Sequence, residues 1–194
     1  SQAVTKISKH VQAQTGDVNL FVTKDQALFT VFRSLPWVPG DKMLLIEHSQ
    51  QAQIFAQCTH LSKQYGVEVV IARISQFVDD DTLLREFGQI LQRVKPKVLV
   101  MPHITELGRV MPVQAIIPMC AEEQVTTVVD GTDAIGNMKI NIGLLNADFY
   151  VARMDCYTFC YPGTSLLVTK SSRQEAVSSL TVSYHHGEGY TKEW

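Results

Sequence analysis

The chain has 194 residues, of which 45% are hydrophobic and 19% charged, so it is long enough for one domain with a sizeable core. Its formal net charge of -2 gives no reason to expect nucleic acid or an anionic membrane as a partner. No apolar run reaches the roughly 18 residues of a membrane span, and the N-terminal segment lacks a signal-peptide core. We therefore expect an intracellular protein whose four cysteines are reduced.

Short apolar runs and helical apolar stripes alternate along the chain. Runs bounded by Gly, Pro, Asn or Asp predict strands over residues 18–23, 43–47, 67–74, 98–103, 126–129, 147–154, 165–169 and 180–184. Apolar residues at helical spacing predict helices over residues 1–15, 25–35, 48–65, 81–94, 112–124 and 171–179. Thr23 or Asp25 is the expected cap of the second helix, and Pro118 predicts a kink in the fifth.

Strands that alternate with helices predict a mostly parallel sheet covered on both faces, which is a three-layer αβα fold. We expect residues 1–194 to form a single domain, because no repeat or low-complexity linker interrupts the pattern. Asp130 directly follows the buried run Thr126–Val129. That is the edge of an open α/β sheet at which ligands bind.

Three motifs carry a family resemblance. The sequence reads V-D-G-x-x-A-x-G over residues 129–136, A-D-F-Y over residues 147–150, and P-G-x-x-x-L-V over residues 162–168. This order resembles the aminotransferase class V family, which has the fold-type I architecture of enzymes that use pyridoxal phosphate (PLP). Its isopenicillin-N-epimerase-like and cysteine-desulfurase-like branch is the most similar. The resemblance implies a large cofactor-binding domain, with the family's smaller C-terminal domain absent from residues 1–194.

The resemblance also assigns positions around the cofactor. Asp130 matches the acid that pairs with the pyridine nitrogen of PLP. The histidine that the family has three residues later is Asp133 here. The family's His-Lys pair, whose lysine forms the Schiff base, falls on Asp155 and Cys156. A thiol cannot form an imine, so the lysine that would hold the cofactor is missing from its matched position.

The phosphate-binding positions differ as well. Asp25 and Gln26 stand where the family has a Thr-Thr pair at a helix start. A carboxylate beside a desolvated phosphate is repulsive by several kcal/mol, and Lys24 would offset part of this repulsion. His48 and His103 match two family histidines near the ring and the substrate-side loop.

Each of these residues also has a purely structural interpretation. Asp130 can cap a turn, and His48 and His103 can be satisfied histidines at helix starts. Cys156 is expected to be a small buried apolar residue, and Asp148 to accept backbone amides near a strand. No metal site is predicted, because no further Cys or His lies at ligand spacing from the Cys156–Cys160 pair.

The chain keeps the apolar pattern of the family's fold but lacks the lysine and several of the phosphate-binding residues. This combination predicts a catalytically inactive relative that binds no PLP. Such a protein would serve as a structural or interaction subunit, in a homodimer or a larger complex with other protein subunits, and a mitochondrial assembly would fit. One alternative is an active PLP-dependent lyase, desulfurase or epimerase whose lysine lies elsewhere or on another chain. Another is a binder of other small molecules, whose cleft near Asp130, Asp133 and Asp155 would prefer a cation or an amine.

Overall fold

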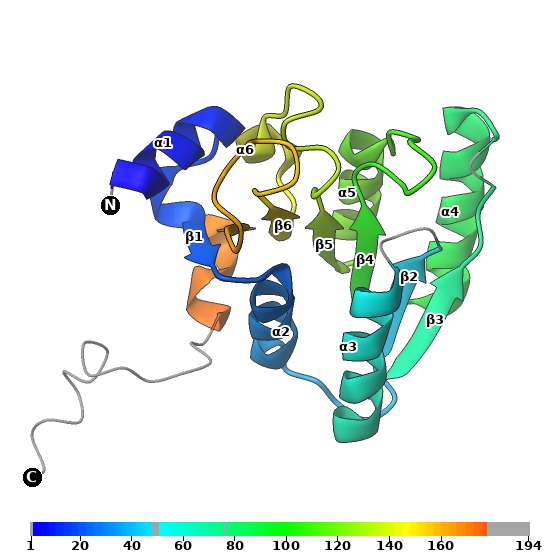
Figure 1. Ribbon diagram of the computed structural model, residues 1–194. Coiled ribbons are helices and arrows are strands. Elements are labelled where there is room, and N and C mark those ends of the chain that lie inside the picture. Colours follow the sequence, from blue (N-terminus) through cyan, green and yellow to red (C-terminus); the bar gives the residue numbers. More distant parts are fainter. Residues whose placement is uncertain (1, 48–50, 76, 178–194) are drawn as a thin grey trace, which may run out of the picture.

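The computed structural model describes residues 2–47, 51–75 and 77–177. In this part of the chain a seven-stranded sheet has the strand order β1-β7-β6-β5-β4-β2-β3, with helices on both sides (Figure 1). The strands are β1 (Val18–Phe21), β2 (Lys42–Ile46), β3 (Glu68–Ala72), β4 (Val98–Pro102), β5 (Thr126–Asp130), β6 (Phe149–Arg153) and β7 (Ser165–Thr169). The helices are α1 (Gln2–Val11), α2 (Lys24–Ser34), α3 (Gln51–Tyr65), α4 (Asp80–Val94), α5 (Val113–Glu122) and α6 (Ile142–Leu145), with 3-10 turns η1 (Thr15–Asp17) and η2 (Ser171–Ala176).

The sheet is mostly parallel, as the sequence predicts. β3, β2, β4, β5 and β6 pair in parallel in that spatial order, and β7 runs antiparallel to both β6 and β1. The parallel strands end in register, with Pro102 opposite Asp130 and Asp130 opposite Val151. The carboxyl ends of β4, β5 and β6 therefore form one edge, and this edge carries Asp130.

Two apolar cores lie on the two faces of the sheet. Alternate side chains of a strand point to opposite faces, so Val128 and Val129 of β5 belong to different cores. The Val128 core includes Phe32 of α2 and Leu61 of α3. The Val129 core takes in residues of α1, α4, α5 and α6 instead. The predicted αβα layering is confirmed.

The structure corrects the prediction near both ends. The predicted helix over residues 1–15 stops at Val11, because Gln12 adopts a left-handed φ of 53° and the Ala13 amide bonds back to the Ser8 carbonyl, a common way to end a helix. Where the structure describes the predicted helix over residues 171–179, up to residue 177, the chain forms the 3-10 turn η2 instead. The short helix α6 was not predicted, and the predicted strand over residues 180–184 lies outside the described residues. None of the helices within the described ranges is long and apolar enough to cross a membrane.

Candidate functional site around Asp130

Asp130 is the last residue of β5, and its side chain is 3% exposed. Its Oδ1 accepts hydrogen bonds from the Thr132 amide at 3.0 Å and the Thr132 hydroxyl at 2.7 Å. Its Oδ2 accepts from Nζ of Lys24 at 2.8 Å. Asp130 therefore caps a turn, as one of its interpretations predicted, but only through Oδ1. Its Oδ2 pairs with Lys24 instead.

Lys24 reaches Asp130 from the first turn of α2. Thr23 caps this helix, because its side chain accepts from the Gln26 amide at 3.2 Å and satisfies one of the amides that a helix start leaves open. Lys24 follows the cap directly, and its side chain is only 2% exposed. The sequence suggested that Lys24 would face a phosphate, whereas the structure turns its amine to the acid at the end of β5.

His103 and Tyr150 form a second buried pair beside Asp130. His103 Nδ1 and the Tyr150 hydroxyl lie 2.8 Å apart and share a hydrogen bond, and the two rings meet edge to face at 5.8 Å between centroids. Burial lowers the pKa of His103 to about 4 and raises the pKa of Tyr150. His103 is therefore a neutral, hydrogen-bonded histidine at neutral pH, as its structural interpretation predicted, although it follows a strand.

The other matched positions lie on a loop and on the turn after β5. Asp155 accepts from Nε of Arg153 at 3.0 Å and from the Gly163 amide at 3.1 Å, and these bonds hold its pKa below the usual range. Asp133 accepts from the Tyr157 hydroxyl at 3.3 Å. The acids expected to share a cleft thus have separate partners, and only Asp130 is buried.

Cys156 departs from its prediction. Its side chain is exposed, because the loop that follows β6 carries it to the surface instead of into a core. Partial desolvation raises the pKa of its thiol, the charges of Asp155 and Asp133 add to the rise, and those of Arg153 and Lys24 oppose it. Cys156 is therefore protonated at neutral pH and is not an activated nucleophile.

The remaining predicted positions are those expected at helix starts and beside a strand. Asp25 is half-buried and accepts from Nε2 of Gln57 at 3.1 Å, while Gln26 is exposed. His48 lies outside the described residues. Asp148 accepts from the Thr127 amide at 2.9 Å, which confirms its predicted role near a strand, and also from Nε of Arg173 at 2.8 Å.

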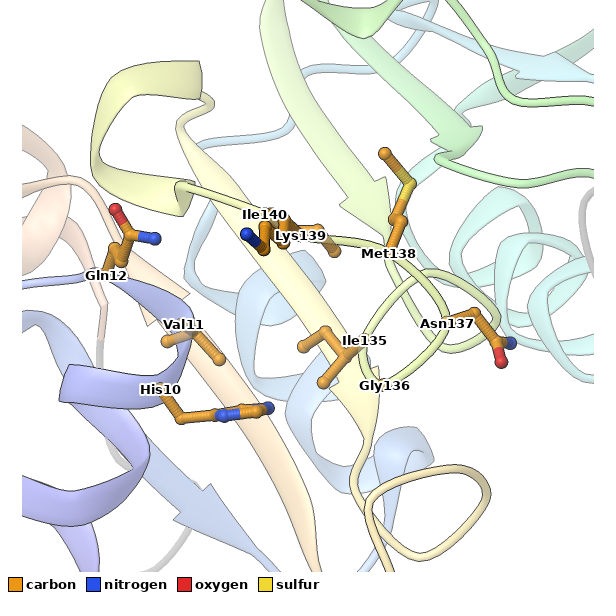
Figure 2. A pocket seen from close by; sticks show the side chains of 9 residues that line it. All are labelled: His10, Val11, Gln12, Ile135, Gly136, Asn137, Met138, Lys139 and Ile140. Carbon is orange, nitrogen blue, oxygen red and sulfur yellow. The ribbon is translucent and has the colours of Figure 1, made fainter.

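Two hollows border this edge of the sheet. One, of about 380 Å³, is lined by Glu106, Asp133 and Tyr157 among others. The other, of about 540 Å³, lies between the end of α1 and the segment 135–140 (Figure 2). Figure 2 shows His10 and Val11 on one side of this larger hollow and Ile135 and Met138 on the other. It contains none of the predicted site residues.

The sequence analysis missed three contacts of the site: Lys24 with Asp130, Thr132 with Asp130, and Tyr150 with His103. Thr132 could have been found, because an Asp two residues before a Thr commonly accepts the amide of that residue. Tyr150 belongs to the quoted A-D-F-Y motif, but the motif does not say which partner its hydroxyl meets. No local signal connects Lys24 to an acid 106 residues away.

Comparison with known protein families gives a match over nearly the whole chain. The family model described as "Aminotransferase class-V" matches residues 2–186. The chain belongs to the aminotransferase class-V family. The resemblance inferred from the three motifs is therefore confirmed, and the layered fold built around the Asp130 edge is that of fold-type I enzymes.

Relatives of this family member are named as enzymes. The hercynylcysteine sulfoxide lyase of Schizosaccharomyces pombe is 18% identical over 187 residues, which cover 94% of this chain and 46% of the lyase. The L-cysteine desulfhydrase of Arabidopsis thaliana is 33% identical over 96 residues, 48% of this chain and 21% of that protein. The chain thus spans about half the length, or less, of these relatives.

Solved structures share the fold. The K223A mutant of C-DES, with glycine covalently linked to the PLP cofactor, superposes with a TM-score of 0.87 at 15% identity, covering 94% of this chain and 48% of that one. A complex of SepCysS with the N-terminal domain of SepCysE gives a TM-score of 0.73 at 12% identity, covering 93% of this chain and 48% of that one. One neighbour thus binds PLP and another binds a partner subunit.

These findings contradict our prediction of an inactive subunit. The relatives are named as a lyase and a desulfhydrase, and a neighbour of the same fold holds PLP, so the predictions of no enzyme and no cofactor are wrong. The absence of a lysine from one matched position does not decide the class of the whole protein. The comparisons favour the PLP-dependent lyase or desulfurase alternative.

The side chains of this family member meet one requirement of PLP and miss another. A buried acid stands at the end of β5, where the pyridine nitrogen of the cofactor would need it. Its Oδ2, however, already accepts from the Lys24 ammonium, and the position matched to the family's lysine is Cys156. As they stand, the described residues do not fit PLP held in the family's manner.

Proposed function

We propose that the chain forms part of a PLP-dependent enzyme that cleaves carbon–sulfur bonds in cysteine-like substrates, as a lyase or a desulfurase. The observation that carries the proposal is the buried acid Asp130 at the ligand-binding edge of a chain that matches the family from residue 2 to residue 186. The named activities of the relatives support the substrate class. We take this chain, which covers 46% of the lyase, to be the counterpart of the large domain of such enzymes.

Under this proposal the amine that holds the cofactor comes from outside the matched position. Cys156 cannot supply it, so the amine belongs to a lysine elsewhere in the protein or on another chain. Asp130 is the residue of this chain that would keep the ring nitrogen protonated, since a buried carboxylate favours a cation beside it. The Thr132 bonds fix the orientation of that carboxylate.

The test is to incubate the protein with PLP and then reduce it with borohydride. We expect an imine absorbance band, a stable PLP adduct on a lysine that peptide mass spectrometry identifies, and sulfide release from L-cysteine. Asp130→Asn should lower sulfide release at least tenfold, because the ring nitrogen would lose its partner. Asp81→Asn, an exposed change at the start of α4, serves as the control. Absence of the adduct and of sulfide release would contradict the proposal.

We also propose that the chain functions with other protein subunits, as a homodimer or within a larger complex. The loop after β6 carries Tyr157, Phe159 and Tyr161, which are 44%, 98% and 88% exposed, and exposed aromatic clusters are typical of contact surfaces. Sedimentation of the wild type and of a Phe159→Ser/Tyr161→Ser variant tests this: we expect the variant to dissociate at higher concentration. An intracellular location remains a prediction from the cysteines.

A second candidate function is the binding of an organic cation without PLP. Glu106 and Asp133 line the hollow of about 380 Å³ beside the site, and a cleft lined by two carboxylates prefers a positive ligand. A thermal-shift screen of small amines tests this candidate, since a ligand that binds the native state raises the melting temperature. If no amine stabilises the wild type more than it stabilises Asp133→Asn, the candidate is wrong.

A further inference from the structure

Lys24 is an unusual residue for its place in the fold. It is the first residue of α2, where the helix macrodipole is positive and disfavours a cation. Its side chain is 2% exposed, although lysines are almost never fully buried unless they are paired. Burial and the helix field both oppose an ammonium group here, and the contact with the Asp130 carboxylate at 2.8 Å counteracts both.

The contact uses the part of Asp130 that a ligand would need. Oδ1 accepts from the amide and hydroxyl of Thr132, which leaves Oδ2 as the oxygen available to a cationic donor. Nζ of Lys24 lies 2.8 Å from Oδ2. A protonated ring nitrogen would offer the same carboxylate a similar charge-assisted N–H donor. The lysine amine and a pyridinium ligand are therefore chemical equivalents for this acid.

We propose that Lys24 is an internal ligand of Asp130, so that a ligand with a cationic nitrogen, of the protonated-pyridine or alkylammonium class, binds there by displacing the Lys24 amine. Where that ligand is PLP, the inference rests on the proposed function. Until such a ligand binds, the Lys24 ammonium occupies its position and donates a hydrogen bond to the buried carboxylate. Affinity for the ligand is then lower than Asp130 alone would give, because the lysine must leave its partner first.

Removing the lysine side chain should open the site. Lys24→Ala leaves Asp130 with a buried, uncompensated charge and leaves space for a short alkylammonium ion. We expect propylammonium chloride to raise the melting temperature of Lys24→Ala at concentrations that leave that of the wild type unchanged, because in the wild type the ligand must first displace Lys24. Tetramethylammonium chloride, which has no N–H donor, should stabilise neither protein. Lys42→Ala removes the lysine of an exposed ion pair with Glu68 and should show no propylammonium effect.

Binding of PLP itself gives a second measurement. Equilibrium dialysis should show at least tenfold tighter binding of PLP to Lys24→Ala than to the wild type. Equal propylammonium shifts in the two proteins, or measurable PLP binding of equal affinity in both, would overturn the inference. If propylammonium rescues Lys24→Ala while neither protein binds PLP or releases sulfide, the proposed function fails and the internal ligand stands.

A double-mutant cycle keeps the proposal testable if Lys24→Ala does not fold. Asp130→Asn leaves the Lys24 ammonium buried without its carboxylate, and Lys24→Ala/Asp130→Asn removes both charges. The internal pair predicts that the double variant is more stable to urea than Asp130→Asn alone, because the buried ammonium that has lost this carboxylate is gone. Stability of the double variant at or below that of Asp130→Asn would show that the two groups do not satisfy each other.

Discussion

At the scale of single residues, the site depends on close contacts that few side chains could replace. Gly131 follows Asp130, and a Cβ placed there would lie 2.1 Å from the hydroxyl oxygen and a ring carbon of Tyr150. The tyrosine ring thus fills the space that another residue would need at position 131. The same ring hydrogen-bonds His103, so the glycine, the tyrosine and the histidine form one packed unit beside the acid.

We therefore expect Gly131→Ala to destabilise the protein by about 2 kcal/mol or more, because overpacking a filled site forces side chains and backbone to shift. Urea denaturation followed by circular dichroism measures the change. Gly16→Ala is the matched control, since a Cβ at Gly16 would meet no atom within 4 Å, and it should change stability by less than about 0.5 kcal/mol. Equal effects of the two substitutions would refute this view of the packing.

His103 should make stability depend on pH. Its folded pKa of about 4 lies below the ordinary value near 6.5, so the unfolded chain binds more protons between these values. Stability is therefore full above about pH 6.5 and falls as the pH drops toward 4, by up to about 3 kcal/mol. Urea unfolding at several pH values should show a smaller decline in His103→Asn than in the wild type. His10→Gln, on the exposed end of α1, should leave the decline unchanged; an equal slope in His103→Asn would disprove the assignment.

At the scale of elements, the start of α2 sets the geometry of the site. The Thr23 cap fixes where the helix begins, and the helix start fixes where the Lys24 side chain leaves the backbone. The register of β4, β5 and β6 then places Asp130 opposite Pro102 and Val151. One helix start and three strand ends thus form the site together.

Removing the cap should weaken both the helix and the site. We expect Thr23→Ala to lower the free energy of unfolding by about 1 kcal/mol, because one helix-start amide loses its acceptor. Thr23→Ser keeps a hydroxyl and should cost less than half as much. Chemical denaturation provides the comparison, and identical losses in the two variants would show that the hydroxyl contributes nothing.

At the scale of the whole molecule, the two cores protect different groups from solvent. Cys58 lies in the core beneath α2 and α3, and Cys120 in the core on the opposite face. Burial raises the pKa of each thiol to about 12. Cys156, in contrast, is exposed and Cys160 is partly exposed.

Thiol labelling should report on this arrangement. In the native protein we expect Ellman's reagent to react fastest with Cys156, more slowly with Cys160, and with Cys58 and Cys120 only after unfolding, because the reagent reaches thiols in the order of their exposure and burial suppresses the reactive thiolate. Cys156→Ser should remove the fast phase, and Cys58→Ser should leave it unchanged. Rapid reaction of all four thiols in the native protein would contradict the two-core description.

The alternation of apolar runs and helical stripes determined the αβα fold, most strand positions and the placement of Asp130 at a strand end, because these depend on local periodicity and turn chemistry. Three short motifs also carried the family. The tertiary structure alone decided that Lys24 meets Asp130, that Tyr150 packs against Gly131 and that Cys156 is exposed. Such contacts join residues far apart in the chain, and their energy comes from burial and pairing across elements, which no local pattern encodes.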